Sequence, residues 1–423
     1  MISLIKRIKF ILVRMVSKIV AIPIACGIFF ISPIVKIRFI KLFSSRIGHY
    51  SINTELILCA LDMKLENDKK CKTLFYTSPG EPICNTQLHR MWKREIPILP
   101  FPFLIADIDN LLLRFGGKKY KNYPIKKLQV DCEDRYNLLV KIKKCHLSFT
   151  PQEKNHGKAL MEELGVPAGA SFVCLLVRDS SYLNAYMPSI DWSYHEYRDA
   201  TINSYQLAAN YLAEKGYYVI RMGKFVKDPF FISHSKVIDY AMSKLQSDFM
   251  DIYLSAYCFF FISTCTGLDS VARVFRKPLL VTNLVLADFD IWHPWRLFIP
   301  KKIMDFKKNK LLTLEEMNKL YFEMRQKKQI PQLMREKGLQ YIDNTPEEIK
   351  DVVEEMLGKL TENLEYSEND ELLQGRFWKK YPKYLASEDL QTLNIPICKD
   401  IKMRVGRDFL KNNLSLLTDM AMS

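Results

Sequence analysis

The chain lacks several of the short motifs by which enzyme classes are recognised. Its 423 residues contain no GxSxG, HExxH or Walker-type phosphate loop. A hydrolase of the α/β type, a zinc protease and a P-loop NTPase therefore lack their minimum parts. No internal repeat with a period of about 20 to 50 residues is visible, which disfavours a solenoid. The chemistry has to be sought in residues that lie apart in the chain and meet in the fold.

Closely spaced cysteines are also missing. The ten cysteines are spread along the chain without a CxxC pair, so neither a disulfide scaffold nor a zinc site with short ligand spacing is expected. Cys174 and Cys258 lie inside apolar runs, where a thiol behaves as a small hydrophobic group. This pattern is typical of a reduced, cytosolic environment.

Acidic residues are absent from the start of the chain. The first one is Glu55, whereas nine basic side chains occur before residue 50 and supply most of the formal net charge of +15. These basic residues flank an apolar stretch and do not alternate with exposed aromatic residues. The pattern favours an anionic membrane surface as partner and disfavours nucleic acid.

The apolar stretch from Ile19 to Val35 carries no charge and lies near the lower limit of about 17 residues for a membrane span. Pro23, Gly27 and Pro33 weaken a straight helix there. Because basic residues occur on both sides, the charge pattern fixes no orientation. A peripheral or monotopic segment at the cytoplasmic face of a bacterial inner membrane is favoured. A true span and an ordinary buried helix stay open, and a cleaved signal peptide is not expected because no small-x-small site follows.

The length and the 48% hydrophobic content suffice for two packed domains. We expect a membrane-associated segment over 1–45, a first α/β domain over 46–165, a second over 166–360 and a helical extension over 361–423. In the first domain the patterns predict helices at 54–62, 85–95 and 104–114, and strands at 72–80 and 96–101.

The second domain has a clearer pattern. Apolar runs predict strands at 172–179, 216–224, 258–264 and 277–283, with helices at 204–215, 246–256 and 267–275. Strands that alternate with helices indicate a parallel sheet, in which ligands bind beyond the carboxyl ends of the strands. The predicted fold class is α/β, with two Rossmann-like domains.

Two of the loops combine cations with small residues. In the first domain, Arg46, Gly48 and His49 follow the basic segment; His49 is a candidate base, although a tight turn with a solvated histidine explains the same residues. In the second domain, Arg178 and Asp179 end the first strand, and a second Arg-Asp pair follows at 198–199. Guanidinium groups at strand ends are suited to phosphate, but both pairs could equally be ion pairs that hold loops.

Two further loops follow later strands of the second domain. Arg221, Gly223 and Lys224 come directly after one strand. Another strand leads through a Ser/Thr/Gly turn into a helix, and its members are Ser263, Thr264, Thr266 and Gly267. Backbone N–H groups at such a helix start attract anions. Plain helix capping needs only one such residue, so a phosphate site is favoured.

Acidic residues are weaker candidates for metal binding or ligand contacts. Asp107 and Asp109 imitate a DxD metal pair, but apolar residues around them mark an amphipathic helix with the acids on its solvated face. Asp248 and Asp251 begin a helix near these loops and are candidates for contacts with hydroxyl groups of a ligand, although acids at a helix start more often complement its dipole. No metal ligand set is assigned.

Three stretches together resemble a family of bacterial glycosyltransferases found with surface-polysaccharide genes. They are YRDATINSYQLAANYLAEKGYYVIRMGK, SDFMDIYLSAYCFFFISTCTGLDSVARVFRKP and LFIPKK, and the resemblance runs from RIGH at 46–49 to the end. It implies a GT-B architecture, with an acceptor site mostly in the first domain and a nucleotide-sugar site mostly in the second. CTG at 265–267 departs from the more glycine- and serine-rich turn expected of that family.

The expected reaction moves a sugar from a nucleotide-diphosphate sugar to a membrane-linked glycan or lipid acceptor, without a cofactor or metal. Arg178, Arg221, Lys224 and the turn at Gly267 are expected to bind the diphosphate and stabilise its departing charge. His49 is the expected base if the reaction inverts. Two alternatives are a transferase of the CDP-glycerol type and a non-catalytic, membrane-docked sugar-binding or scaffold protein.

Overall fold

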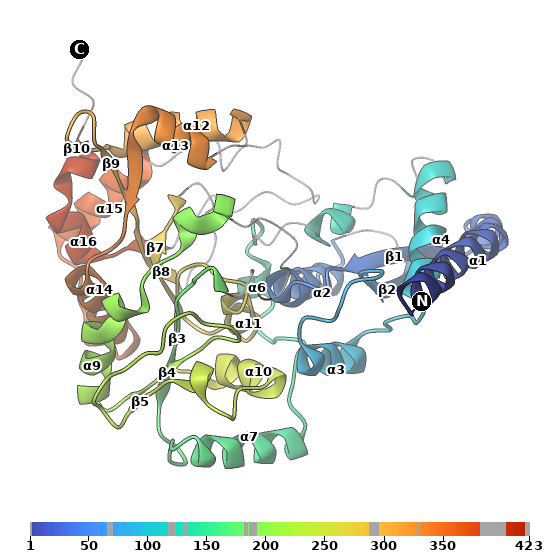
Figure 1. Ribbon diagram of the computed structural model, residues 1–423, viewed down its shortest axis with the longest axis horizontal. Helices are drawn as coiled ribbons and strands as arrows, with labels where there is room; N and C mark the ends of the chain where they lie inside the picture. Colours follow the sequence, from blue (N-terminus) through green and yellow to red (C-terminus); the bar gives the residue numbers. More distant parts are fainter. Residues whose placement is uncertain are drawn as a thin grey trace. The chain divides into compact units, whose positions relative to one another are not determined.

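A computed structural model describes residues 2–65, 71–116, 120, 124–129, 134–181, 185, 193–286, 296–327, 330–380 and 403–418. The described residues form two compact units, which meet in the sequence between Phe149 and Thr150. Figure 1 labels their helices and strands. The sequence analysis placed this limit later, after residue 165, so that helix α7 (Pro151–Glu163) fell in the first domain.

Helix α7 lies in the second unit because it packs on α10 (Asp248–Tyr257) of that unit. The ring of His156 is 4.9 Å from that of Phe249. Gly157 makes the closest approach: a Cβ built there would lie 2.1 Å from Tyr253 Cε2. Glycine at this position is thus what allows the helix to dock.

Unit 1 is built around two parallel strands, β1 (Lys36–Leu42) and β2 (Cys71–Thr77), which pair over their full length. Its longer helices are α1 (Ile2–Ile31), α2 (Thr54–Asp62), α3 (Thr86–Glu95) and α4 (Pro102–Phe115), and α6 (Leu138–Lys141) is one turn long. The predicted helices are confirmed to within two residues. The predicted strand at 96–101 is wrong, since only an isolated bridge joins Ile98 to Phe75.

The last part of the segment predicted over 1–45 forms β1. Alternation in KIRFIKL places Phe39 in the core and Arg38 on the other face of the strand. Arg38 is only 3% exposed and donates a hydrogen bond of 2.7 Å to Thr73 Oγ1. It is therefore not available to lipid headgroups.

Helix α1 runs continuously through Pro23, which the sequence analysis expected to weaken it. Packing against α4 stabilises it: Ala21, Ala25 and Ile28 share a core cluster with Ile108 and Leu112. The opposite side is rich in exposed apolar residues. The stretch Phe10–Ile31 is long and apolar enough to cross a membrane, and most of it is not buried within the protein.

The two acids of α4 do not lie on a solvated face, so that expectation is wrong. Arg14 donates to both carboxylate oxygens of Asp107 at 2.9 and 3.0 Å, which ties α4 to α1. Asp109 is buried and accepts from Lys126 Nζ at 2.6 Å and from Tyr76 Oη at 3.2 Å. Both acids serve packing within unit 1.

Unit 2 contains a seven-stranded parallel sheet in the order β12-β8-β7-β6-β3-β4-β5. Its strands are β3 (Phe172–Leu176), β4 (Tyr218–Arg221), β5 (Val237–Ile238), β6 (Phe261–Ser263), β7 (Leu279–Leu284), β8 (Arg296–Pro300) and β12 (Arg404–Val405). In chain order, β3 to β8 follow the classic doubly wound order 3-2-1-4-5-6. The prediction of a parallel α/β sheet is confirmed for this unit.

Helices lie on both sides of this sheet (Figure 1). On one side α9 (Gln206–Glu214) packs against α14 (Pro346–Leu360), and on the other α10 packs against α11 (Asp269–Val274). A small antiparallel sheet joins β9 (Lys302–Asp305), β10 (Lys310–Leu311) and β11 (Leu339–Ile342).

Further helices of unit 2 are α12 (Leu314–Lys327), α13 (Ile330–Lys337), α15 (Glu368–Lys380) and α16 (Arg407–Asn412). Of the predicted C-terminal extension over 361–423, α15, β12 and α16 belong to unit 2, with β12 added to the edge of the main sheet. Residues 381–402 and 419–423 lie outside the described residues.

Candidate functional site

The order of the strands in unit 2 reverses between β3 and β6. These strands are neighbours in the sheet, although β4 and β5 separate them in the chain. At such a reversal the loops leave in opposite directions and open a crevice outside the carboxyl ends, where doubly wound proteins bind ligands. The segments that leave here, 177–181 and 264–268, are two of the loops that the sequence analysis selected.

Arg178 holds three segments together at this reversal. Its backbone N–H donates to Thr264 Oγ1 at 2.9 Å, which joins the loops after β3 and β6. Its side-chain Nε donates to Asp199 Oδ1 at 3.2 Å, and its carbonyl accepts from Ala200 N–H at 3.1 Å. The two Arg-Asp pairs of the sequence therefore do meet, as one cluster.

A second guanidinium group, that of Arg198, lies close by. It donates to the carbonyl of Cys265 at 3.0 Å, and Cys265 has φ of +61°, a left-handed conformation that aims this carbonyl. Burial lowers the pKa of Arg178, the nearby charge of Arg198 lowers it further, and Asp199 opposes both. Two like charges held this close form a place where an added anion is stabilised.

Lys301 completes the cluster from the LFIPKK segment. Only 3% of its side chain is exposed. Its Nζ donates to the carbonyl of Asp199 at 2.7 Å and lies 2.7 Å from Asp343 Oδ1. Burial raises the pKa of Asp199, which Arg178 and Lys301 oppose. The buried lysine thus fixes the position of the Asp199 segment.

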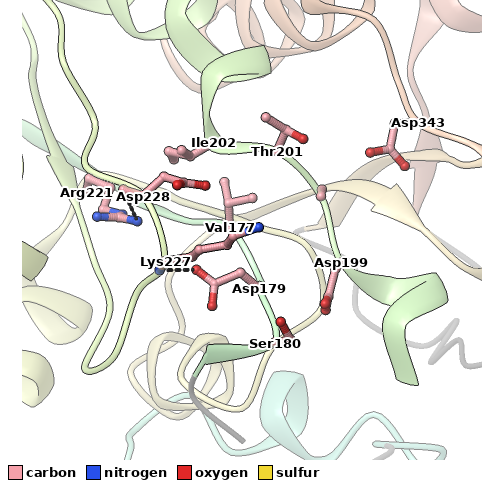
Figure 2. Close-up of a pocket in the computed structure, with 11 residues that line it drawn as sticks. Val177, Asp179, Ser180, Asp199, Thr201, Ile202, Arg221, Lys227, Asp228 and Asp343 are labelled. Carbon is pink, nitrogen blue, oxygen red and sulfur yellow. Dashed lines mark hydrogen bonds between the residues drawn. The ribbon is translucent and has the colours of Figure 1, made fainter. Parts of the chain in front are cut away.

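A cavity of about 240 Å³ opens beside this cluster. Figure 2 shows Asp179, Lys227 and Asp228 on one side of it, and Asp199 and Asp343 on the other. The remaining lining comes from the ends of β3 and β4 and from the start of the short 3-10 helix η4 (Ile202–Tyr205), namely Val177, Ser180, Ala200, Thr201, Ile202 and Arg221. Its four carboxylates outnumber its two cations, which suits hydroxyl groups better than phosphate.

Arg221 lines this cavity but is almost wholly engaged by the protein. Only 2% of its side chain is exposed. It donates to Asp239 Oδ1 and to the carbonyl of Asp228, both at 3.0 Å. Arg221 thereby positions the segment that carries Asp228, whereas the sequence analysis expected direct contact with the departing diphosphate.

The Ser/Thr/Gly turn after β6 is occupied by a carboxylate of the chain itself. Asp269 Oδ2 accepts from Ser263 Oγ at 2.7 Å and from Thr266 N–H at 2.8 Å. Helix α11, which follows, is only six residues long. Neither this turn nor Gly267 lines the cavity. In this structure Asp269, the first residue of α11, therefore accepts the hydrogen bonds that the turn can donate.

The loop after β4 has a structural explanation too. Gly223 has φ of +151°, and a Cβ there would lie 2.4 Å from Val226 Cγ1, so only glycine fits. Lys224 Nζ donates to Asp248 Oδ1 at 3.0 Å. Asp251 is 5% exposed and accepts from Tyr240 Oη at 2.9 Å, so it is not available to a sugar hydroxyl as the sequence analysis allowed.

In unit 1, His49 begins a short π-helix (His49–Asn53) after the loop that leaves the carboxyl end of β1. Its ring lies 5.7 Å from that of Phe43, and its Nδ1 is 3.4 Å from Asn53 Nδ2. Gly48 has φ of −60°, which any residue adopts, so its glycine is not required by the backbone. His49 is half-buried and Arg46 is exposed.

The structure brings Arg178 and Thr264 together at the strand reversal, with Arg221 at the neighbouring cavity. Ser263 and Thr266 face Asp269, and Gly223, Lys224 and Gly267 lie outside the cavity lining. The sequence analysis missed Asp228, Asp343 and Lys301. Only Lys301 had a signal in the sequence, since LFIPKK was part of the resemblance.

No protein-family model and no curated protein matches the chain. Among solved structures, a glycosyltransferase family 9 protein of Veillonella parvula is 7% identical, covers 63% of this chain and 86% of its own, and has a TM-score of 0.37. E. coli ADP-heptose LPS heptosyltransferase II is 14% identical, covering 58% of this chain and 84% of its own at a TM-score of 0.30.

The iron-containing dodecameric glycosyltransferase TibC from enterotoxigenic E. coli is 14% identical. It covers 62% of this chain and 63% of its own, with a TM-score of 0.32. All three TM-scores are below 0.5, so these likenesses carry no conclusion about the fold or the chemistry of this chain.

Proposed function

We propose that the protein is a glycosyltransferase that moves a sugar from a nucleotide-diphosphate sugar to a membrane-linked glycan or lipid acceptor in surface-polysaccharide synthesis. The observation that carries the proposal is the meeting of Arg178 and Arg198 at the strand reversal, beside a cavity lined by carboxylates. Guanidinium groups suit a diphosphate, and carboxylates suit the hydroxyls of a sugar or ribose.

The cavity takes one part of the donor and not the whole of it. Its volume of about 240 Å³ is below the ~300–1,000 Å³ typical of sites that enclose a complete ligand. In our proposal Asp228 and Asp343 accept hydrogen bonds from the hydroxyls of a ribose or sugar that enters the cavity. The diphosphate lies outside it, against the arginine pair.

The negative charge that develops on the departing nucleotide needs a fixed positive field. Arg178 and Arg198 supply it, with the Ser/Thr/Gly turn as a structural support behind them. We propose that Mg²⁺ and Mn²⁺ are not required, because the guanidinium groups take their part. Turnover is then expected to stay within a few-fold when both ions are left out of the assay.

We propose that unit 1 binds the acceptor and contacts the membrane. His49 follows the carboxyl end of β1 and is the candidate base for the acceptor hydroxyl if the reaction inverts. Helix α1 exposes a wide apolar surface together with the basic side chains of Arg7 and Lys18. Such a surface suits a peripheral or monotopic location at the cytoplasmic face of a bacterial inner membrane.

The test is product analysis with a panel of nucleotide sugars and bacterial membranes as the acceptor source. Transfer of a labelled sugar to the lipid or glycan fraction supports the proposal. Transfer of phosphoglycerol from CDP-glycerol replaces it with a polyol-phosphate transferase. Binding of a nucleotide sugar without any transfer replaces it with a sugar-binding or scaffold protein.

A further inference from the structure

A cluster of three different metal-ligating groups lies in unit 1, apart from the site described above. Glu55 and Cys59 are one turn apart on α2, so their side chains share a face of that helix. His146 reaches the same place from the loop that follows α6. The loop and the helix are 91 positions apart in the sequence at Glu55 and His146.

The ligand atoms are close together and withdrawn from solvent. His146 Nδ1 lies 3.1 Å from Glu55 Oε2, and Cys59 Sγ lies 3.8 Å from Glu55 Oε1. The three ligand atoms all lie within 4.8 Å of one another. Glu55 and Cys59 are fully buried, and the His146 side chain, 19% exposed, leaves a route from solvent.

A fourth residue orients the histidine. His146 Nε2 lies 3.0 Å from Asp62 Oδ2, on the same helix as Glu55 and Cys59. Ligating histidines characteristically donate their second ring N–H to a carboxylate, which fixes the tautomer that leaves the other nitrogen facing the metal. Asp62 is placed for this role, and it leaves His146 Nδ1 directed at Glu55 and Cys59.

We propose that Glu55, Cys59 and His146 bind a zinc ion, with solvent in a fourth position. A sulfur, a nitrogen and an oxygen ligand suit Zn²⁺ and not Mg²⁺ or Ca²⁺, which prefer oxygen alone. Zinc bonds of roughly 2.0–2.3 Å place tetrahedral ligand atoms about 3.5 Å apart. The distances to the Glu55 carboxylate, 3.1 Å from His146 Nδ1 and 3.8 Å from Cys59 Sγ, lie on either side of that value.

The bound ion links the loop that carries His146 to helix α2 of unit 1. The loop that carries His146 is the last segment before Phe149, where unit 1 ends. Binding requires loss of the thiol proton of Cys59, so uptake of the ion releases a proton. A structural role is expected, because neither Glu55 nor Cys59 is open to a substrate.

A metal-free explanation exists for part of the cluster. An imidazolium ion can donate from both ring nitrogens, one to Glu55 and one to Asp62. Burial lowers the pKa of His146, but the two carboxylates outweigh it and the net shift is upward. In this explanation Cys59 stays a protonated thiol that donates to Glu55 Oε1, whereas the zinc site requires its thiolate. Cys59 therefore separates the two.

The experiment is metal analysis and cobalt substitution of the purified full-length protein. We expect one zinc per chain, and after exchange a Co²⁺ spectrum with a thiolate charge-transfer band and the visible bands of a tetrahedral ion. Cys59→Ala should abolish the thiolate band and weaken Co²⁺ binding at least 100-fold. Asp62→Asn, which removes only the outer partner, should weaken binding about 10- to 100-fold.

The matched control is Cys174→Ala, which removes a fully buried thiol from unit 2 and should leave the spectrum unchanged. X-ray absorption of the unmodified zinc protein gives a result that does not depend on any variant folding, and one sulfur with two or three nitrogen or oxygen ligands is expected. A shell without sulfur, no stoichiometric metal, or an unchanged spectrum in Cys59→Ala would each overturn the proposal and leave the imidazolium bridge.

Discussion

Ser263 donates its hydroxyl hydrogen to Asp269 Oδ2 at 2.7 Å, at the turn that leads from β6 into α11. The same oxygen accepts the N–H of Thr266 at 2.8 Å. A phosphate at this turn would meet the carboxylate of Asp269, which already accepts the hydrogen bonds from Ser263 and Thr266. In our proposal the guanidinium groups of Arg178 and Arg198, and not this turn, bind the anion at this edge of the sheet.

The first prediction tests that assignment. Arg178→Ala and Arg198→Ala should each weaken binding of a nucleoside diphosphate about 10- to 100-fold, because a charge-assisted hydrogen bond contributes roughly 1.5–3 kcal/mol. Isothermal calorimetry measures the change, and Arg335→Ala on the exposed end of α13 is the matched control. The assignment is wrong if Thr266→Ala weakens binding and the two arginine variants do not.

The second prediction concerns Arg221, whose guanidinium is paired with Asp239 and 2% exposed. Removing one member of a buried pair leaves the other without its partner, so Arg221→Ala should destabilise unit 2 by about 3–5 kcal/mol. Thermal denaturation measures this loss. Nucleotide affinity, measured well below the variant's melting temperature, should fall only through displacement of Asp228. A direct contact with the diphosphate would instead lower turnover about 100-fold with little change in melting.

Local patterns in the sequence were sufficient to predict much of unit 2. Continuous apolar runs such as FVCLL fall in β3, which is buried along its whole length, and a run of this kind fits only a strand covered on both faces. The shortest strands were not predicted. Strands β5 and β12 have two residues each, which is too few for an alternation of apolar and polar side chains to be recognised. Strand β1 was assigned to the membrane segment because its basic residues, Lys36, Arg38 and Lys41, continued the basic pattern of the segment before it.

The site was less predictable, since its members are joined by the fold and not by spacing. The link between Arg178 and Thr264 followed from strand ends that meet at one edge. The sequence did not show that Asp269 accepts hydrogen bonds from the turn, because an acid at a helix start also commonly complements the helix dipole. The cluster on α2 was missed because its histidine is distant in the chain.

The third prediction is a pH dependence of stability from Asp251. Burial, with Asp248 adding to it, raises the pKa of Asp251 to about 6, against the opposing effects of Tyr240, Lys224 and Gln246. A folded-state pKa above the unfolded value makes this contribution full below about pH 4 and lost as the pH rises through 6. The difference amounts to about 3 kcal/mol.

Asp251→Asn keeps the acceptor for the hydroxyl of Tyr240 but does not ionise. The melting temperature of the unmodified protein should therefore fall relative to that of Asp251→Asn as the pH rises from 4 to 7. Parallel melting curves for the two proteins over this range would show that Asp251 has an ordinary pKa in the folded chain.

The fourth prediction addresses how α1 meets the membrane. Arg7 and Lys18 are exposed, whereas Arg14 is bonded to Asp107, so only the first two are free of a structural role in the α1–α4 contact. Arg7→Glu with Lys18→Glu should weaken binding to anionic vesicles at least tenfold at low salt, with a smaller effect at high salt. Vesicle sedimentation measures the binding.

Lys154→Glu with Lys158→Glu, which makes the same charge change on exposed positions of α7, should leave vesicle binding unchanged. Retention of the Arg7/Lys18 variant in cell membranes, with release by detergent only, would indicate that the stretch Phe10–Ile31 crosses the bilayer.

The last prediction separates acceptor chemistry from donor binding. A base at His49 acts on the acceptor hydroxyl and does not touch the nucleotide, so His49→Ala should keep the affinity for a nucleoside diphosphate within about twofold. Transfer should fall about 10²- to 10⁴-fold, the range typical of a lost general base. His49→Gln, which keeps a polar side chain beside Asn53, should lose as much transfer with less change in stability, and His156→Ala on α7 should lose none.

If the reaction is retaining, both His49 variants keep their turnover. If calorimetry shows that His49→Ala loses nucleotide binding while Arg178→Ala keeps it, the donor binds unit 1 and the division of labour proposed for the two units is reversed.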